Sequence, residues 1–292
     1  MRKELISGFA DEAAKDFTTQ LETVRGLGMK YLCIRAIDGR SIVDFTVDEA
    51  KSYIKPMLDR YGLSVSSLGS PIGKIPVNDE EAFHKQCGQL ETLCGIANVV
   101  GAKFIRLFSF YIPKGEDAAP YHDVVIAKLR KFAAICRTYG VTPMHENEKG
   151  IYGDVGKRCR EIHQALENDG LVCAYDFANF VQCDEDTVEC YKLLAPWIRY
   201  VHIKDALYKD HTVVLAGTGD GQLKKVFTML KEAGYDGFLT MEPHLRTFAS
   251  LKSLETTVTE KTVTDGVYKD GVEAYTAQYR ALCGILDEIG VQ

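Results

Sequence analysis

The sequence lacks the segments that would anchor it in a membrane or divide it into domains. No run approaches the roughly 20 apolar residues of a membrane span, and residues 1–8 contain no long apolar stretch typical of a signal peptide. Only eight prolines occur in 292 residues, and no Ser/Gly-rich or like-charged block separates two halves. We therefore expect a single domain spanning 1–292 in a cytoplasmic protein with no membrane partner.

Paired cysteine motifs and excess positive charge are missing as well. The nine cysteines are an odd number with no CxxC pair, which indicates reduced thiols rather than a disulfide framework. The 35 Lys and Arg residues are outnumbered by 41 Asp and Glu residues, giving a net charge of -6. Because a nucleic-acid surface needs clustered positive charge, we expect no nucleic-acid partner. No G-x-G-x-x-G follows the first expected strand, which argues against a dinucleotide-binding sheet.

Short apolar runs alternate with helical patterns along the whole chain, which is 46% hydrophobic. The runs are too apolar for one face of the sheet to be exposed to solvent. Eight strand-helix units in order favour an α/β fold, a single-domain (β/α)8 TIM barrel. The expected strands are 5–9, 31–35, 64–68, 104–108, 141–146, 171–175, 199–203 and 237–241. The expected helices are 13–27, 47–61, 80–100, 121–139, 155–168, 185–194, 223–233 and 274–289.

Four residues with metal-ligand side chains lie at or one step past the end of an apolar run: Glu146, Asp176, His202 and Glu242. Catalytic groups of a barrel gather at the C-terminal ends of its strands, so ligands from the fifth to the eighth strand reach one point near the axis. Three carboxylates and an imidazole suit a divalent cation that keeps positions open for a substrate. The pattern predicts one divalent-metal site at the barrel mouth.

Several motifs in this part of the chain resemble the xylose isomerase-like TIM barrel superfamily, in its branch of sugar and sugar phosphate isomerases and epimerases. The resemblance spans nearly the whole chain and depends on the order and spacing of the motifs. They are His145-Glu146-Asn147-Glu148, Tyr175-Asp176-Phe177-Ala178-Asn179, Val201-His202-Ile203-Lys204-Asp205, Gly217-Thr218-Gly219-Asp220-Gly221 and Gly234-Tyr235-Asp236-Gly237, the last leading to Glu242-Pro243-His244.

The resemblance implies a metal-dependent enzyme of carbohydrate metabolism. The matching Glu146, Asp176, His202 and Glu242 would bind one divalent ion, with manganese as the first candidate and magnesium, cobalt or zinc as alternatives. Glu146 and Glu242 would also be catalytic, exchanging protons with the substrate. The implied reaction is isomerisation or epimerisation of a small sugar or sugar phosphate through an enediolate.

Six further residues are candidates for substrate binding. Lys204 shares a strand face with His202, where it would stabilise an oxyanion or grip a hydroxyl or phosphate. Asn179 stands where many sugar epimerases carry a histidine, and Arg35 where many relatives carry a carboxylate. A cation at position 35 favours an acidic substrate group, unless it simply forms ion pairs inside the barrel mouth. The set is completed by Arg106, Lys74 and His244.

Other functions remain open on the same scaffold. One is a dehydratase or lyase, such as an inosose or dehydroshikimate dehydratase or a C-glycoside-cleaving enzyme, and another is a non-catalytic sugar-binding protein. An apurinic endonuclease would need more histidines than the seven present. The long segments 204–221 and 243–271 lie on the active-site side and are expected to be functional. The resemblance implies a small-molecule carbohydrate substrate, and we expect that the barrel can form a homo-oligomer.

Overall fold

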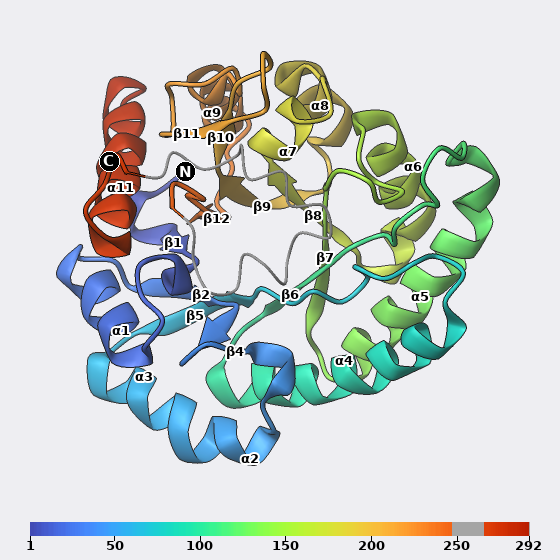
Figure 1. The fold of residues 1–292 in the computed structure, drawn as a ribbon, viewed down its shortest axis with the longest axis horizontal. Coiled ribbons are helices and arrows are strands. Elements are labelled where there is room, and N and C mark those ends of the chain that lie inside the picture. The colour runs from blue at the N-terminus through green and yellow to red at the C-terminus, as the bar shows by residue number, and fades with distance from the viewer. Residues whose placement is uncertain (247–265, 292) are drawn as a thin grey trace.

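Eight parallel strands form a barrel in the computed structural model, which describes residues 1–246 and 266–291 (Figure 1). The hydrogen-bonded order is β1-β12-β9-β8-β7-β6-β5-β2, and a parallel bridge between Phe9 and Cys33 joins the first and last strands of this order. The predicted TIM barrel is confirmed. The strands are β1 (Ile6–Gly8), β2 (Tyr31–Ile34), β5 (Ser64–Leu68), β6 (Phe104–Leu107), β7 (Thr142–Glu146), β8 (Val172–Asp176), β9 (Ile198–Ile203) and β12 (Phe238–Met241).

Helices surround the barrel in the order of the chain, from α1 (blue) to α11 (red) (Figure 1). The first and last of these helices, α1 and α11, lie side by side. Their apolar faces pack against the outside of the sheet and form the main hydrophobic core. The helices are α1 (Phe17–Gly26), α2 (Val47–Glu49), which continues through a π-helical turn into α3 (Lys55–Tyr61), α4 (Glu80–Val100), α5 (His122–Thr138), α6 (Gly156–Leu166), α8 (Thr187–Leu194), α9 (Leu223–Glu232) and α11 (Gly271–Glu288).

Helix α1 begins four residues later than the apolar pattern predicts. Residues Ala10–Glu12 form a separate 3-10 turn, and the helix starts after Asp16, whose carboxylate accepts a hydrogen bond from Thr19 N at 2.8 Å. An aspartate at this position satisfies an otherwise unpaired amide of the first turn, so it fixes the start of the helix. The segment before α1 is thereby left to contribute side chains to the barrel mouth.

The barrel interior is layered from apolar to charged. Met144, Ala174 and Tyr200 form a small apolar cluster inside the barrel. The Tyr200 hydroxyl lies 2.8 Å from both Ser66 Oγ and Ser67 Oγ, which adds a layer of hydroxyl groups. Because side chains alternate along a strand, residues two positions further on, at 146, 176 and 202, point into the interior one layer higher. The strand ends therefore carry their ionisable groups inward, as predicted.

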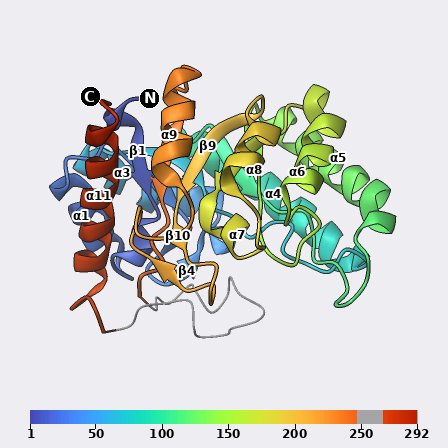
Figure 2. The same cartoon turned by 90° about the horizontal axis from the view of Figure 1, so that it is seen from above.

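The C-terminal end of the barrel carries the additional elements. Figure 2 shows α7 (Phe177–Val181), β4 (Arg40–Ser41) and β10 (Asp205–Ala206) at one end of the molecule and both termini at the other. β4 pairs with β3 (Ala36–Ile37), and β10 pairs with β11 (Val213–Val214). These short elements follow strands β2, β8 and β9, so they surround the site that the strand ends create.

The glycine-rich motif 217–221 wraps around the buried carboxylate of Asp205. The amides of Gly217, Gly219 and Gly221 donate hydrogen bonds to this carboxylate at 2.9, 3.0 and 2.9 Å. A Cβ on Gly219 would lie 2.4 Å from Asp205 Oδ1, so only glycine fits there. The amides are thus engaged within the protein, and the motif is a turn before α9 rather than a phosphate loop.

No helix of the described residues is long and apolar enough to cross a membrane. Of the predicted functional segment 243–271, residues 247–265 lie outside the part of the chain that the structure describes. The remainder leads from β12 to the start of α11, where Asp270 caps the helix by accepting a hydrogen bond from Glu273 N at 2.9 Å. The predicted helix 274–289 accordingly begins three residues earlier.

Candidate metal centre

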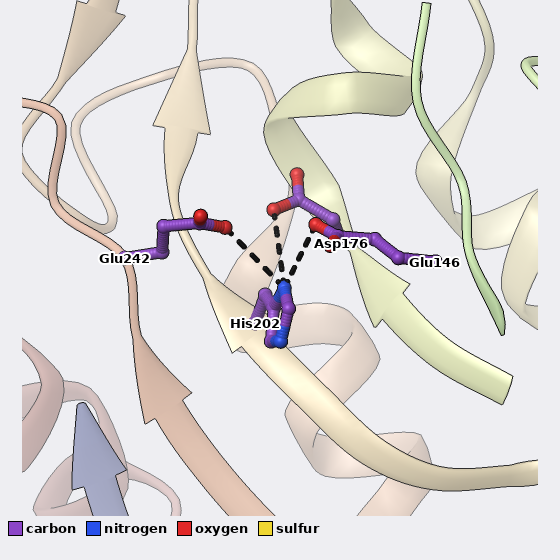
Figure 3. A group of neighbouring side chains, drawn as sticks. All are labelled: Glu146, Asp176, His202 and Glu242. Atoms are coloured by element: carbon purple, nitrogen blue, oxygen red, sulfur yellow. Dashed lines mark hydrogen bonds and ion pairs between the residues drawn. The ribbon is translucent and has the colours of Figure 1, made fainter. Parts of the chain in front are cut away.

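The four predicted ligands converge at the mouth of the barrel (Figure 3). Glu146 ends β7, Asp176 ends β8, His202 lies in β9, and Glu242 directly follows β12. His202 Nδ1 lies 2.8 Å from Glu146 Oε1, 3.3 Å from Glu242 Oε2 and 4.0 Å from Asp176 Oδ2. One ligand atom from each residue lies within 4.8 Å of all the others.

This donor set fits a divalent cation. All four side chains are at most 4% exposed. Asp176 Oδ2 and Glu242 Oε2 make ion-pair contacts, but within the described residues they accept no well-formed hydrogen bond. Buried charged oxygens without hydrogen bonds are costly unless a cation is supplied. Three carboxylate oxygens and one imidazole nitrogen are ligands that manganese, magnesium and zinc accept.

The crowding of the carboxylates also affects proton binding. Burial alone would lower the pKa of His202, but the neighbouring Glu146 and Glu242 raise that pKa to about 9. Burial raises the pKa of Asp176 to about 7, with Lys204 opposing the rise. Burial would also raise the pKa of Glu242, yet Lys204 and His202 hold it well below its usual range. The site therefore attracts positive charge, and a metal ion would compete with protons for it.

Arg35 lies inside a cage of carboxylates. Its guanidinium contacts Asp11 Oδ2 at 2.9 Å, Glu12 Oε1 at 3.0 Å and Glu242 Oε1 at 3.0 Å. It also lies 4.5 Å from the centre of the Phe9 ring. Asp11 and Glu12 come from the turn before α1, and no sequence motif had pointed to them. Their one signal in the sequence is their place directly after the first strand.

A second ligand-type group, Glu12, Glu242 and His244, lies beside the first. His244 Nε2 is 3.5 Å from Glu12 Oε1 and 3.6 Å from Glu242 Oε1, and the His244 amide donates to Glu12 Oε2 at 2.6 Å. His244 has a left-handed backbone (φ 46°), which this hydrogen bond helps to hold. Since the Arg35 guanidinium already lies within 3.0 Å of both glutamates, it supplies the positive charge at this second group.

Arg106 links the two predicted catalytic residues. Its Nη1 lies 3.0 Å from Glu146 Oε2 and 3.3 Å from Glu242 Oε1, and its side chain is 2% exposed. Each glutamate thus turns one oxygen toward His202 and the other toward an arginine. This arrangement fixes the orientation of both carboxylates, because a guanidinium binds carboxylate oxygens in a planar geometry.

The remaining predicted residues line the pocket above the metal centre. Lys204 Nζ lies 3.3 Å from Asp176 Oδ2 and 3.7 Å from Glu242 Oε2. Asn179 Nδ2 donates to Asn147 O at 2.8 Å and lies 3.4 Å from Glu146 Oε1. The pocket is lined by Lys74, Arg106, Glu146, Glu148, Asn179, Gln182, Lys204, Glu242 and His244.

Two pocket residues, Glu148 and Gln182, were missed by the sequence analysis. Glu148 stands in the quoted motif two residues after Glu146, but β7 ends at Glu146, so strand alternation gave no reason to place it inward. Gln182 caps the short helix α7, whose existence the apolar pattern did not predict.

The fold and these motifs agree with one family model. The model of the xylose isomerase-like TIM barrel matches residues 21–263. The chain belongs to this family. A curated relative, the uncharacterized protein YihM of Escherichia coli K12, is 36% identical over 76 residues, and the match spans 24% of this chain and only 23% of the relative.

Several solved structures share the fold over almost the whole chain. The IOLI protein with a bound zinc atom has a TM-score of 0.74 at 15% identity, covering 98% of this chain and 99% of that one. The probable 3-DHS dehydratase AsbF from Bacillus anthracis has a TM-score of 0.71 at 13% identity, covering 97% and 99%. The 3-keto-D-glucoside 4-epimerase YcjR from E. coli has a TM-score of 0.70 at 14% identity, covering 98% and 100%. At these identities the likeness concerns the fold.

Proposed function

We propose that this chain is a divalent-metal-dependent isomerase or epimerase of a small carbohydrate. The observation that carries the proposal is the arrangement of the two glutamates. Glu146 and Glu242 approach His202 from opposite sides (Figure 3), and each also contributes to the candidate metal site. Two carboxylates on either side of one substrate carbon are what proton removal and return require. The family membership and the epimerases among its structural neighbours agree with this chemistry.

The metal ligands are Glu146, Asp176, His202 and Glu242. A divalent ion held there, with manganese first and magnesium, cobalt or zinc as alternatives, would supply Lewis-acid polarisation of the substrate carbonyl and so acidify the adjacent C–H group. One glutamate removes this proton and the other returns one to the enediolate. Return to the opposite face gives an epimer, and return to the neighbouring carbon gives an isomer.

The other residues of the pocket bind the substrate in this mechanism. Lys204, whose Nζ lies beside Asp176 and Glu242, stabilises the developing oxyanion. Asn179, Lys74 and His244 contact the hydroxyl groups of the substrate from the pocket wall.

Arg35 and Arg106, candidates for substrate binding or for ion pairs inside the barrel mouth, orient the glutamates in this mechanism. The two arginines lie within 3.3 Å of Glu242 Oε1, and Arg106 also contacts Glu146 Oε2.

A dehydratase is the second candidate, since AsbF shares the fold and loss of water from a β-hydroxy carbonyl compound begins with the same proton removal. The two candidates differ in the mass of the product. Metal analysis of the purified protein, followed by a panel of ketoses and hydroxy-ketones in D2O, tests both. NMR reports deuterium incorporation without loss of water for an isomerase or epimerase, and loss of water for a dehydratase. A protein that takes up no divalent metal and exchanges no substrate proton would contradict the proposal.

A further inference from the structure

The positive groups of the pocket are all engaged with carboxylates. The lining residues include three cations, Lys74, Arg106 and Lys204, and three carboxylates. Lys74 Nζ lies 2.8 Å from Glu148, Arg106 lies 3.0 Å from Glu146, and Lys204 lies 3.3 Å from Asp176. Each of the three cations thus already has a carboxylate partner, so a phosphate group could pair with one of them only by displacing that carboxylate.

The Lys74–Glu148 pair is a built feature of the pocket wall rather than a loose surface contact. The Lys74 and Glu148 side chains are only 9% and 17% exposed, and Lys74 Nζ lies 4.5 Å from the centre of the Phe108 ring. The preceding residue, Gly73, has a φ of +93°, and a Cβ there would lie 1.9 Å from Phe108 O. The amide of Gly73 donates to Gln86 Oε1 at 2.8 Å. The backbone that presents Lys74 is thus tightly fixed.

Such a pair suits hydroxyl groups. A hydroxyl both donates and accepts hydrogen bonds, and the ammonium of Lys74 donates while the carboxylate of Glu148 accepts. A phosphate dianion, which only accepts, would lie against the Glu148 carboxylate and would need to break the ion pair. The Glu148 carboxylate therefore repels a phosphate group, whereas Lys74 and Glu148 together attract a hydroxyl group.

We propose that the Lys74–Glu148 pair is the specificity element of this pocket, which binds the hydroxyl groups of an uncharged ketose or keto-sugar and excludes phosphorylated sugars. This inference rests on the proposed function, and it names the substrate class of the same site. Glu148 is the residue that decides it, because its carboxylate neutralises Lys74.

The test is Glu148→Gln, which keeps the size of the side chain and removes its charge. The matched control is Glu189→Gln, because Glu189 also pairs with a lysine, Lys192 at 2.7 Å, but on the exposed surface of α8. Isothermal titration calorimetry on the metal-loaded protein measures binding of inorganic phosphate, D-xylulose, D-fructose and the terminal phosphate esters of both ketoses. Deuterium exchange in D2O is measured for the four sugars in parallel. Metal content and melting temperature are recorded for each variant.

The wild-type protein is expected to prefer the neutral ketoses. Glu148→Gln is expected to bind inorganic phosphate and the phosphate esters about tenfold more tightly and the neutral ketoses about tenfold more weakly, about 1.4 kcal/mol each way. Glu189→Gln should change neither. A wild-type preference for the phosphate esters, or a Glu148→Gln variant with unchanged affinities, would overturn the inference. Absence of exchange in all four sugars would instead count against the proposed function, and the phosphate affinity of Glu148→Gln would still decide the role of the pair.

Discussion

Arg35 Nη1 lies 3.0 Å from Glu242 Oε1, so the end of β2 is tied to the end of β12 across the intervening strand β1. Both side chains are almost completely buried. The same guanidinium is the counter-ion of Asp11 and Glu12, and burial raises the pKa of Glu12 to about 8 despite this arginine. The contact makes the orientation of a proposed catalytic carboxylate depend on a cation that does not face the substrate.

Replacing Arg35 by Met is therefore expected to cost both stability and turnover. The variant would leave three buried carboxylates without their shared counter-ion, and breaking a buried ion pair in this way costs about 3 kcal/mol or more. Urea denaturation measures the loss. The control is Arg40→Met, because the Arg40 side chain is 47% exposed and pairs with Glu49, and its loss should cost much less stability than the loss of Arg35. Equal losses of stability in the two variants would contradict the role of Arg35 as the shared counter-ion of Asp11, Glu12 and Glu242.

The candidate metal centre predicts that divalent ions stabilise the folded chain. At a free metal concentration of 100 times the dissociation constant, binding to the native state adds about 2.7 kcal/mol. Thermal denaturation with and without Mn²⁺ should show this gain in the wild-type protein and its loss in Asp176→Asn, which removes a ligand charge at constant size. Asp48→Asn, at a carboxylate that is 93% exposed, is the control and should retain the gain. A metal response that survives Asp176→Asn would exclude Asp176 as a ligand.

His163 predicts a pH dependence of stability that is separate from the metal centre. Its ring is buried between Trp197, with centroids 5.9 Å apart, and His145, at 5.7 Å. Burial lowers the pKa of His163 to about 4, below the ordinary value of 6.5. Because the folded-state pKa is the lower one, the unfolded chain binds the proton more readily. The contribution of neutral His163 to stability is thus complete above pH 6.5 and is lost as the pH falls toward 4.

The measurement compares His163→Phe with the wild-type protein by urea denaturation at several pH values. Between pH 6.5 and 4 the stability of the wild-type protein should fall by about 3 kcal/mol more than that of the variant. Phenylalanine preserves the stacking on Trp197 and removes the titrating group. Parallel pH profiles for the two proteins would show that His163 does not titrate as described.

Asp205 is expected to support the site through the loop that it organises. Asp205→Asn replaces one of two acceptor oxygens by a donor, which would face amides that now bond to the carboxylate. Leaving buried donors unsatisfied costs about 1–3 kcal/mol, and the loss should be visible in urea denaturation. Turnover should also fall, because Lys204 directly precedes this residue. Asp220→Asn serves as the control, since Asp220 accepts from one exposed backbone amide, that of Tyr208 at 2.8 Å. A cost no greater than that of the control would contradict this role.

Much of the fold and the convergence of the candidate metal ligands were predictable from the sequence. Strand-end carboxylates and a histidine are visible wherever an apolar run stops, and the barrel brings such ends together, as it does for Glu146, Asp176, His202 and Glu242. The sequence could not assign partners to the cations. For Arg35 the residue type left two possibilities, an acidic substrate group or ion pairs inside the barrel mouth. The structure shows ion pairs with Asp11 and Glu12, which approach only after the turn before α1 forms.

Glu148 shows a second limit. Strand periodicity predicts which side chains point inward only while the strand continues, and β7 ends two residues before Glu148. Its inward position depends on the loop that follows and on Lys74, which lies 74 residues earlier in the chain. Contacts of this kind follow from tertiary structure and leave no local pattern.

The most direct test of the central claim is deuterium incorporation into a ketose by the metal-loaded protein in D2O, measured by NMR for the wild type, Glu146→Gln and Glu242→Gln. Wild-type protein is predicted to exchange a proton at the carbon next to the carbonyl. Each variant should reduce this exchange by at least about 100-fold, because general acid–base catalysis contributes about 10²–10⁴-fold. Exchange at the wild-type rate in both variants, with metal still bound, would contradict proton transfer by Glu146 and Glu242.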